Sequence, residues 1–254
     1  MAITGTDRGT GTNNSATQSW TVTPGGNMAQ NSWAVLCIAA DNGSSGGATN
    51  DFGVVTDTIG NTWQLMQAPL FDNGSASAGV QGAIYVSTMH AGAVGTGTTI
   101  TVRTATNATA KTWALHEIVP TSSAYKLNFV KGANGTGATG TAASITTGSI
   151  ASGNIVIAAS FDEYGTAQTP TGANDTTNGT WSTMLTTEIG TTAAGMSIIS
   201  QRKVVSGTGT QLFNAVWGTS SDYIDAWIEL TEVAKTTAVR DMLRSGLIPS
   251  TRTQ

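Results

Sequence analysis

Few residues of this chain have side chains suited to nucleophilic or acid–base chemistry. The 254 residues include one Cys and two His. Cys37 lies inside an apolar run, where a thiol behaves as a small hydrophobic side chain. His116 lies between Leu115 and Glu117 in an alternating strand pattern, so its ring is expected to face the side opposite to both. Neither His116 nor His90 has a metal-binding partner close in sequence and no Gly-x-Ser-x-Gly motif occurs, so the sequence predicts no catalytic residue.

Two glutamates follow the same local pattern in the two halves of the chain. Glu117 and Glu232 each stand two residues after a leucine and before an aliphatic residue. A glycosidase needs its two carboxylates about 5 to 10 Å apart in one site. Equivalent positions of two tandem domains normally lie farther apart. We therefore expect structural hydrogen bonding from these glutamates, and not glycoside hydrolysis.

Acidic loops offer oxygen atoms of the kind that calcium binds. Examples are Asp41-Asn42-Gly43 and Asp72-Asn73-Gly74. None of these loops follows the twelve-residue EF-hand pattern, and Asp-Asn-Gly is first of all a turn signal. We expect no metal and no other cofactor.

The seven tryptophans include one matched pair. Trp63 and Trp181 each follow a turn of Gly, Asn and Thr and begin a predicted strand. Such repetition favours packing in a core. If exposed, the pair could instead stack on sugar rings, so Trp63 and Trp181 are the candidate carbohydrate-stacking residues of an alternative function considered below.

Composition excludes several classes of protein. Only 10% of the residues are charged, less than half the usual share, so a helix-rich or coiled-coil protein is excluded. The net charge of −4, together with recurring apolar clusters, argues against disorder. The eleven cations are too thinly spread for a nucleic-acid interface, and no apolar stretch is long enough for a membrane helix. The N-terminal residues lack the basic and apolar regions of a signal peptide, so we expect synthesis in a cytoplasm.

The chain contains an internal repeat of five blocks in the same order. The matched blocks are 33–41 with 154–162, 60–66 with 178–185, 82–87 with 195–200, 95–98 with 207–210, and 115–118 with 230–233. The offset drifts from 121 to 112 and 115, and the drift falls in segments rich in Gly, Asn and Ser. Loop insertions on a fixed scaffold produce this pattern.

Each block predicts a β-strand. The apolar runs are short, rich in β-branched or aromatic residues, and bounded by turn residues. Block 33–41 is apolar throughout, as in the central strand of a sheet. Many short strands separated by turns indicate an antiparallel sandwich or jelly roll. We predict an all-β protein with two tandem antiparallel, jelly-roll-like β-sandwich domains, residues 1–120 and 142–233, joined by a linker or turn over 121–141.

The C-terminal segment 234–254 differs from the rest in charge. It has four cations and one carboxylate, a net +3, whereas residues 1–233 have seven cations and fourteen carboxylates, a net −7. Thr236 and Thr237 can cap a short helix with an apolar stripe, so we expect a basic helix and tail. This element either docks on a partner or folds back on its own domain. The candidate docking residues are Val239, Arg240, Met242, Leu243, Arg244 and Leu247.

The order of the blocks resembles a repeat found in bacteriophage virion proteins. That repeat has a Thr-rich strand, an apolar strand, an Asp-x-x-Gly-Asn-Thr-aromatic turn, an aliphatic strand, a Thr-rich hairpin and a closing hydrophobic-x-Glu strand. Here the turn is residues 57–63 and the closing element is residues 115–118, while the second copy departs from the pattern at 175–181. Proteins of this kind are capsid decoration (cement) proteins, tail components or fibre modules.

The resemblance implies a virion structural protein and no enzyme. We expect a capsid decoration protein that binds and stabilises the outer shell in many copies or as a homo-oligomer, docked through its N-terminal segment or basic tail. Its partners would be the major capsid protein or other virion proteins, and neither nucleic acid nor a membrane. The alternative is a tail or fibre module that binds host-surface carbohydrate. A glycan hydrolase is a third reading, disfavoured because the sequence shows no catalytic residues.

Overall fold

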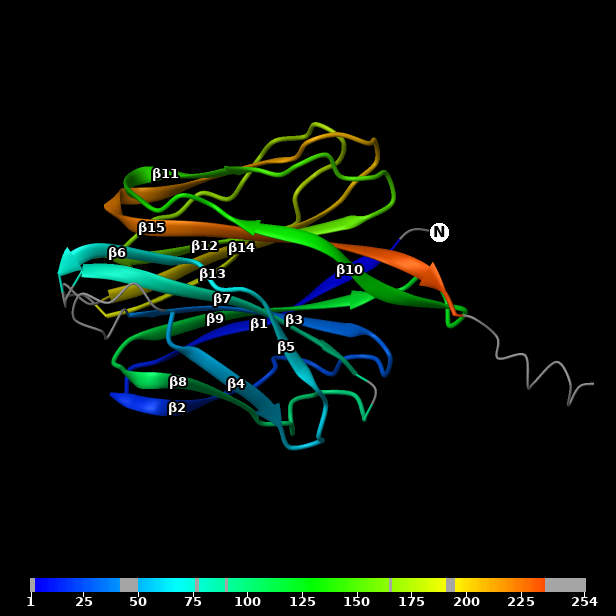
Figure 1. Ribbon diagram of the computed structural model, residues 1–254, viewed down its shortest axis with the longest axis horizontal. Coiled ribbons are helices and arrows are strands. Elements are labelled where there is room, and N and C mark those ends of the chain that lie inside the picture. The colour runs from blue at the N-terminus through cyan, green and yellow to red at the C-terminus, as the bar shows by residue number, and fades with distance from the viewer. Residues whose placement is uncertain are drawn as a thin grey trace, which may run out of the picture.

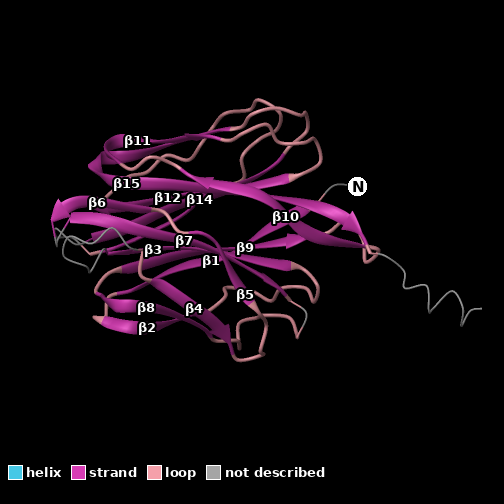
Figure 2. Ribbon diagram, in the orientation of Figure 1, coloured by secondary structure: helices cyan, strands magenta, loops and turns pink. Residues whose placement is uncertain are grey.

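The protein is built from antiparallel β-sheets. The computed structural model describes residues 3–41, 50–75, 78–89, 91–164, 166–190 and 195–235, and these residues contain strands and loops but no helix (Figure 2). The all-β prediction is confirmed. The predicted C-terminal helix lies outside the described residues.

The strands, in chain order, are β1 (Thr4–Asn13), β2 (Thr17–Val22), β3 (Trp33–Asp41), β4 (Phe52–Asp57), β5 (Trp63–Gln67), β6 (Leu70–Ser75), β7 (Ala78–Thr88), β8 (Ile100–Ala108), β9 (Lys111–Val119), β10 (Tyr125–Asn134), β11 (Ala138–Thr146), β12 (Ile155–Tyr164), β13 (Leu185–Ile189), β14 (Gly195–Val204) and β15 (Leu212–Ala234). They form three sheets. Sheet A has the order β1-β9-β3-β7-β5, with β6 paired to β7; sheet B has the order β2-β8-β4; sheet C has the order β10-β15-β12-β14-β13, with β11 paired to β15.

The sheets are stacked in layers. In Figure 1, sheet B, sheet A and sheet C follow one another from bottom to top. Within sheet C, β11 and the first part of β15 lie above the other strands. Strand β3 shows why the layers hold together, because both of its faces are apolar. Val35 and Cys37 pack in a core shared with sheet C, whereas Leu36 and Ile38 pack in a core shared with sheet B. A third core lies on the other face of sheet C.

The two halves have the same strand order, but their match differs by one residue from the sequence alignment. The turn before β3 is closed by a hydrogen bond from Ser32 N–H to the Ala29 carbonyl, and the turn before β12 by one from Asn154 N–H to the Ala151 carbonyl, so position 32 matches 154. Two residues on, Ala34 lies opposite Glu117 in β9, and Val156 lies opposite Glu229 in β15. Position 34 therefore corresponds to 156, an offset of 122 rather than 121. Since successive residues of a strand face opposite sides, this shift decides which face each side chain occupies. The counterpart of Glu117 is Glu229, and the predicted pairing of Glu117 with Glu232 is wrong.

Residues 121–141 are not the predicted linker. Most of this segment is β10, which adds to β15 as β1 adds to β9, and thus acts as the first strand of the second half. Its glycines suggested a turn, but Gly132 sits in the strand because packing leaves no space for a side chain. A Cβ there would lie 2.5 Å from the carbonyl oxygen of Trp227 and 2.6 Å from the Gln67 side chain. Only residues 135–137 separate β10 from β11.

Sheets A and C pack with approximate twofold symmetry. Strand β1 contacts β13 while β5 contacts β10, and β9 contacts β14 while β7 contacts β15. Strands β3 and β12, which correspond to each other, are also in contact. Each of these contacts has a counterpart with the halves exchanged, which is the geometry of an isologous dimer interface contained in one chain. The shared core between these sheets is one continuous hydrophobic cluster.

Candidate functional site

The turn that begins at Asp57 is the most specific sequence motif of the chain, and its carboxylate accepts hydrogen bonds from the turn itself. One carboxylate oxygen, Oδ1, accepts hydrogen bonds from the backbone N–H groups of Ile59, Gly60 and Asn61 at 2.8–3.1 Å. The other, Oδ2, accepts from the Asn61 amide at 3.0 Å and from Nε1 of Trp63 at 2.9 Å. Gly60 has a φ of 91°, a conformation that favours glycine. The motif therefore closes the turn and orients Trp63.

The pKa of the Asp57 carboxyl is consistent with that structural role. Burial alone would raise the pKa of Asp57, but the hydrogen bonds from Trp63, Asn61 and the turn backbone outweigh burial and hold the pKa below its ordinary value. In the second half the same position is built differently. Asp175 accepts from Lys203 Nζ at 3.0 Å, and Trp181 donates its Nε1–H to the carbonyl of Leu212 at 2.9 Å.

Replacing Asp57 tests this assignment. Asp57→Ala removes the acceptor of five hydrogen bonds and is expected to lower the free energy of unfolding by about 2–4 kcal/mol. Asp57→Asn keeps one oxygen for the backbone N–H groups but turns an amide toward the Trp63 donor, so it should cost about half as much. Urea denaturation followed by tryptophan fluorescence measures both. Equal stability of Asp57→Ala and the unchanged protein would contradict the assignment.

The tryptophans of the repeat are core residues. Trp63 and Trp181 lie opposite Ser87 and Lys203, which confirms their equivalence. Their exposed fractions are only 9% and 6%. The Trp181 ring packs edge-on against Phe213, and Lys203 Nζ lies 5.4 Å from the centre of the Trp181 ring. Neither ring therefore offers a face for stacking on a sugar.

A Ser-His-Asp arrangement occurs between sheets A and C, although sequence inspection did not find it. His116 Nδ1 lies 3.1 Å from Asp7 Oδ1 in β1, and His116 Nε2 lies 2.7 Å from Ser200 Oγ in β14. In the tautomer that fits both contacts, the imidazole donates to Asp7 and accepts from Ser200. Arg202 forms an ion pair with Asp7. These are the bonds of a catalytic triad.

Burial prevents this arrangement from meeting a substrate. His116 and Ser200 are both fully buried. Burial lowers the pKa of His116, although the hydrogen bond and the charge of Asp7 oppose that effect. The pKa of Asp7 is held below its ordinary value because the hydrogen bond from His116 and the charge of Arg202 together outweigh its desolvation. A neutral imidazole between an ionised carboxylate and a hydroxyl therefore joins the two sheets.

Cys37 lies at the same interface, so the reactivity of its thiol measures how often the interface opens. Its Sγ lies 3.6 Å from Ser200 Oγ, it is fully buried, and burial raises its pKa to about 12. We expect Cys37 to react with a thiol reagent at pH 8 at least about 1,000-fold more slowly in the native protein than in urea, because reaction requires opening of the fold. Cys37→Ser supplies the blank. Rapid reaction of the native protein would show that the interface is open.

Glu117 and Glu232, the two glutamates that the sequence pattern singled out, act as hydrogen-bond acceptors. Glu117 accepts from Arg8 Nε at 2.8 Å and from the backbone of Ala29. Glu232 accepts from the Thr121 hydroxyl at 2.8 Å and from the Thr121 backbone N–H. Glu229, the true counterpart of Glu117, accepts from the Asn154 amide at 2.5 Å. The predicted structural use of Glu117 and Glu232 agrees with these contacts.

Three further carboxyl groups are buried at one end of sheet C. Burial raises the pKa of Asp162 and of Glu163 to about 8, and that of Asp225 to about 7. Ser221 donates to Asp162, and the backbone N–H of Gly79 donates to Glu163. One oxygen of each carboxyl has no hydrogen-bond partner among the described residues. These groups are therefore protonated below neutral pH.

The remaining expectations concern metals, membranes and the tail. In the described ranges no group of three or more His, Cys, Asp or Glu side chains is placed to hold a metal ion. The described part of the chain also lacks a helix long and apolar enough to cross a membrane. His90, the loop 42–49 and all six predicted docking residues lie outside the described residues. Those residues are Val239, Arg240, Met242, Leu243, Arg244 and Leu247.

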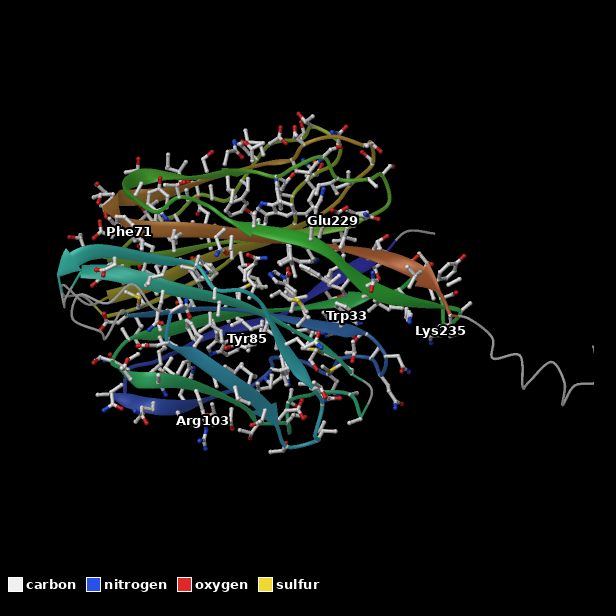
Figure 3. All side chains as sticks on the ribbon, viewed as in Figure 1. Trp33, Phe71, Tyr85, Arg103, Glu229 and Lys235 are labelled. Atoms are coloured by element: carbon white, nitrogen blue, oxygen red, sulfur yellow. The ribbon has the colours of Figure 1, made fainter. Side chains whose placement is uncertain are left out.

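Two adjoining hollows lie where β10 begins and β15 ends. Their volumes are about 290 and 300 Å³, and Asn31 and Lys235 line both. Figure 3 shows Trp33 and Lys235 at this end of the molecule. We call this surface the end groove.

Comparison of the chain with protein-family models, curated proteins and solved structures finds no match.

Proposed function

We propose that this protein is a bacteriophage virion structural protein, a capsid decoration (cement) protein that binds the outer shell and stabilises it. The observation that carries the proposal is that the polar groups able to do chemistry serve the fold itself. The Asp7–His116–Ser200 arrangement is sealed between sheets, and the Asp57 turn, Glu117 and Glu232 hold strands and loops in place. A rigid, charge-poor body with internal polar contacts suits a part that must survive outside a cell.

The architecture supports the same proposal. We interpret sheets A and B as one jelly-roll-like β-sandwich, and sheet C with β11 and the first part of β15 as a second copy. The closing strand of each copy pairs with its opening strand, β9 with β1 and β15 with β10. Two such copies that share a core form a stiff block, which resembles the tandem modules of virion proteins.

The proposed docking element is the basic segment that follows β15. The strand ends at Ala234 (Figure 1), and the Lys235 N–H donates to the carbonyl of Ala124 at 2.8 Å, so the last described residue before this segment is held in place. Residues 236–254 then carry three arginines and one aspartate. The major capsid protein is the proposed partner, reached through this segment.

The copy number per virion tests the proposal. A decoration protein should be present in hundreds of copies, measured by quantitative mass spectrometry of purified particles. Deleting residues 236–254 should weaken attachment to shells at least tenfold, while the joint change Arg240→Gln and Arg244→Gln tests charge alone. A count of only a few copies, located at the tail, would overturn the proposal.

A further inference from the structure

The end groove has walls that are fixed before any ligand arrives. Tyr125 N–H donates to the carbonyl of Ser122 at 3.1 Å, and Lys235 is held by Ala124. On the opposite wall, Asn31 N–H donates to the carbonyl of Met89 at 3.1 Å. A preformed groove loses less conformational entropy on binding than a mobile surface.

Asn31, which both hollows share, has an unusual backbone. Its φ is 66°, and the equivalent position in the second half, Gly153, also has a positive φ of 89°. Both residues lie in matching turns, because Ser32 N–H bonds to Ala29 and Asn154 N–H bonds to Ala151. Glycine adopts this conformation with the least strain. The first half therefore keeps a polar side chain where the second half has none, and it does so in the groove.

The lining combines an aromatic face with amide groups. Tyr125 is 39% exposed, so part of its ring is open to the groove. Gln64 and Asn128 line the second hollow, and amides both donate and accept hydrogen bonds. Sugars present apolar C–H faces between hydroxyl edges. An aromatic ring beside amides matches both features.

The positive charge of the groove favours an acidic sugar over a neutral one. Lys126 and Lys235 line the groove, and among the described residues no Asp or Glu does so. This is a local excess of positive charge in a chain whose net charge is −4. Lysine ammonium groups form charge-assisted hydrogen bonds with carboxylates.

We propose that the end groove binds an acidic oligosaccharide, one that carries carboxylate groups on its rings. Tyr125 stacks on a sugar face, Lys126 and Lys235 bind the carboxylates, and Asn31, Gln64 and Asn128 bind hydroxyl groups. Binding of this kind would let a virion adhere to anionic surface polysaccharide. The inference does not depend on the capsid attachment proposed above.

Isothermal titration calorimetry of the full chain tests the groove with hexasaccharides of hyaluronan, alginate and oligogalacturonate. The methyl ester of the oligogalacturonate is the matched neutral probe. We expect at least one acidic probe to bind, with affinity that falls as salt is raised, because screening weakens exposed charge pairs. Absence of binding by all three acidic probes overturns the proposal, and so does equal affinity for the acidic and esterified forms.

Variants locate the site. Tyr125→Ala and the joint change Lys126→Gln with Lys235→Gln are each expected to weaken binding about tenfold or more. Arg103→Gln removes a cation from the outer surface of sheet B, and Leu212→Ala truncates a side chain of similar exposure, 37%. Both controls should bind as the unchanged protein does, with all variants checked for an unchanged thermal transition. Full affinity in the Tyr125 and lysine variants overturns the assignment.

Discussion

Phe161→Ala is expected to lower the free energy of unfolding by about 3–5 kcal/mol, the usual cost of removing a buried aromatic ring. The Phe161 ring is fully buried in the core that sheets A and C share. It packs on Gly82 of β7, where a Cβ would lie 2.3–2.6 Å from three ring carbons. The absence of a side chain at Gly82 is therefore what lets the ring enter the interface.

The same contact predicts a strong coupling between the two positions. Gly82→Ala alone places a methyl group against the ring and should cost about 1–3 kcal/mol, as overpacking does. Combined with Phe161→Ala, the methyl group fills part of the cavity. The double variant should then be more stable than the sum of the single effects by about 1–3 kcal/mol. Urea denaturation of the four proteins completes the cycle.

Phe213 provides the control for this cycle. It is also fully buried, but it packs in the third core, away from sheet A. Phe213→Ala should cost a similar amount, and its effect should simply add to that of Gly82→Ala. Additive effects for Phe161 as well would show that the two halves do not press together at Gly82.

The second large effect is a gain of stability on mild acidification. Burial raises the pKa values of Asp162 and Asp225 to about 8 and about 7, against an ordinary 3.8. The folded protein therefore binds protons at a pH where the unfolded chain has released them. Each such proton changes stability by about 1.4 kcal/mol per pH unit. The stabilisation that these two carboxyl groups provide is fully present below about pH 4. It is lost as the pH rises through their folded-state pKa values, about 7 and about 8.

His116 opposes this trend over part of the range. Its folded pKa lies below the ordinary 6.5, so the unfolded chain takes up its proton first and stability falls as the pH drops below about 6.5. With two deeply buried carboxyl groups against one imidazole, and Glu163 adding to the former, the carboxyl groups prevail. We expect the protein to be more stable at pH 5 than at pH 8 by on the order of 3–5 kcal/mol, an increase in melting temperature of about 10 °C.

Calorimetry between pH 5 and pH 8 measures this effect. The joint change Asp162→Asn and Asp225→Asn removes two of the titrating groups and should flatten the profile. Asp57→Asn is the control, because the pKa of Asp57 is lowered, this group stays ionised throughout the range, and its hydrogen-bond donors are neutral. Its profile should keep the slope of the unchanged protein. A protein most stable at pH 8 would contradict the assignment of buried, protonated carboxyl groups.

The strands were the most predictable part of the fold. Turn residues and β-branched runs mark most of them, and the continuous apolar run at 33–41 correctly indicates a strand covered on both faces. Strand β10 was missed because its glycines serve close packing and not a turn. The one-residue error in the repeat has a related cause. Ile155, Val156 and Ile157 are all apolar, so the sequence carries no mark of which face each one occupies.

The sealed Ser-His-Asp arrangement could not be predicted from the sequence. Its members come from β1, β9 and β14; Asp7 and His116 are 109 positions apart in sequence, and His116 and Ser200 are 84 apart. No local motif connects them, because the contact depends on how two sheets pack. The alternation around His116 did predict that its ring would lie opposite to Leu115 and Glu117. It did not show that this side is an interface.

The shared core also sets a problem of timing during synthesis. Sheet A is complete once β9 has left the ribosome, but the sheet that covers its second apolar face needs residues 121–234. At about 5–20 residues per second, that face waits on the order of 10 s for its partner. During this interval the nascent chain exposes a surface that fits the C-terminal half of any copy. High expression should therefore favour exchange of halves between neighbouring chains, and slower translation or lower temperature should reduce it.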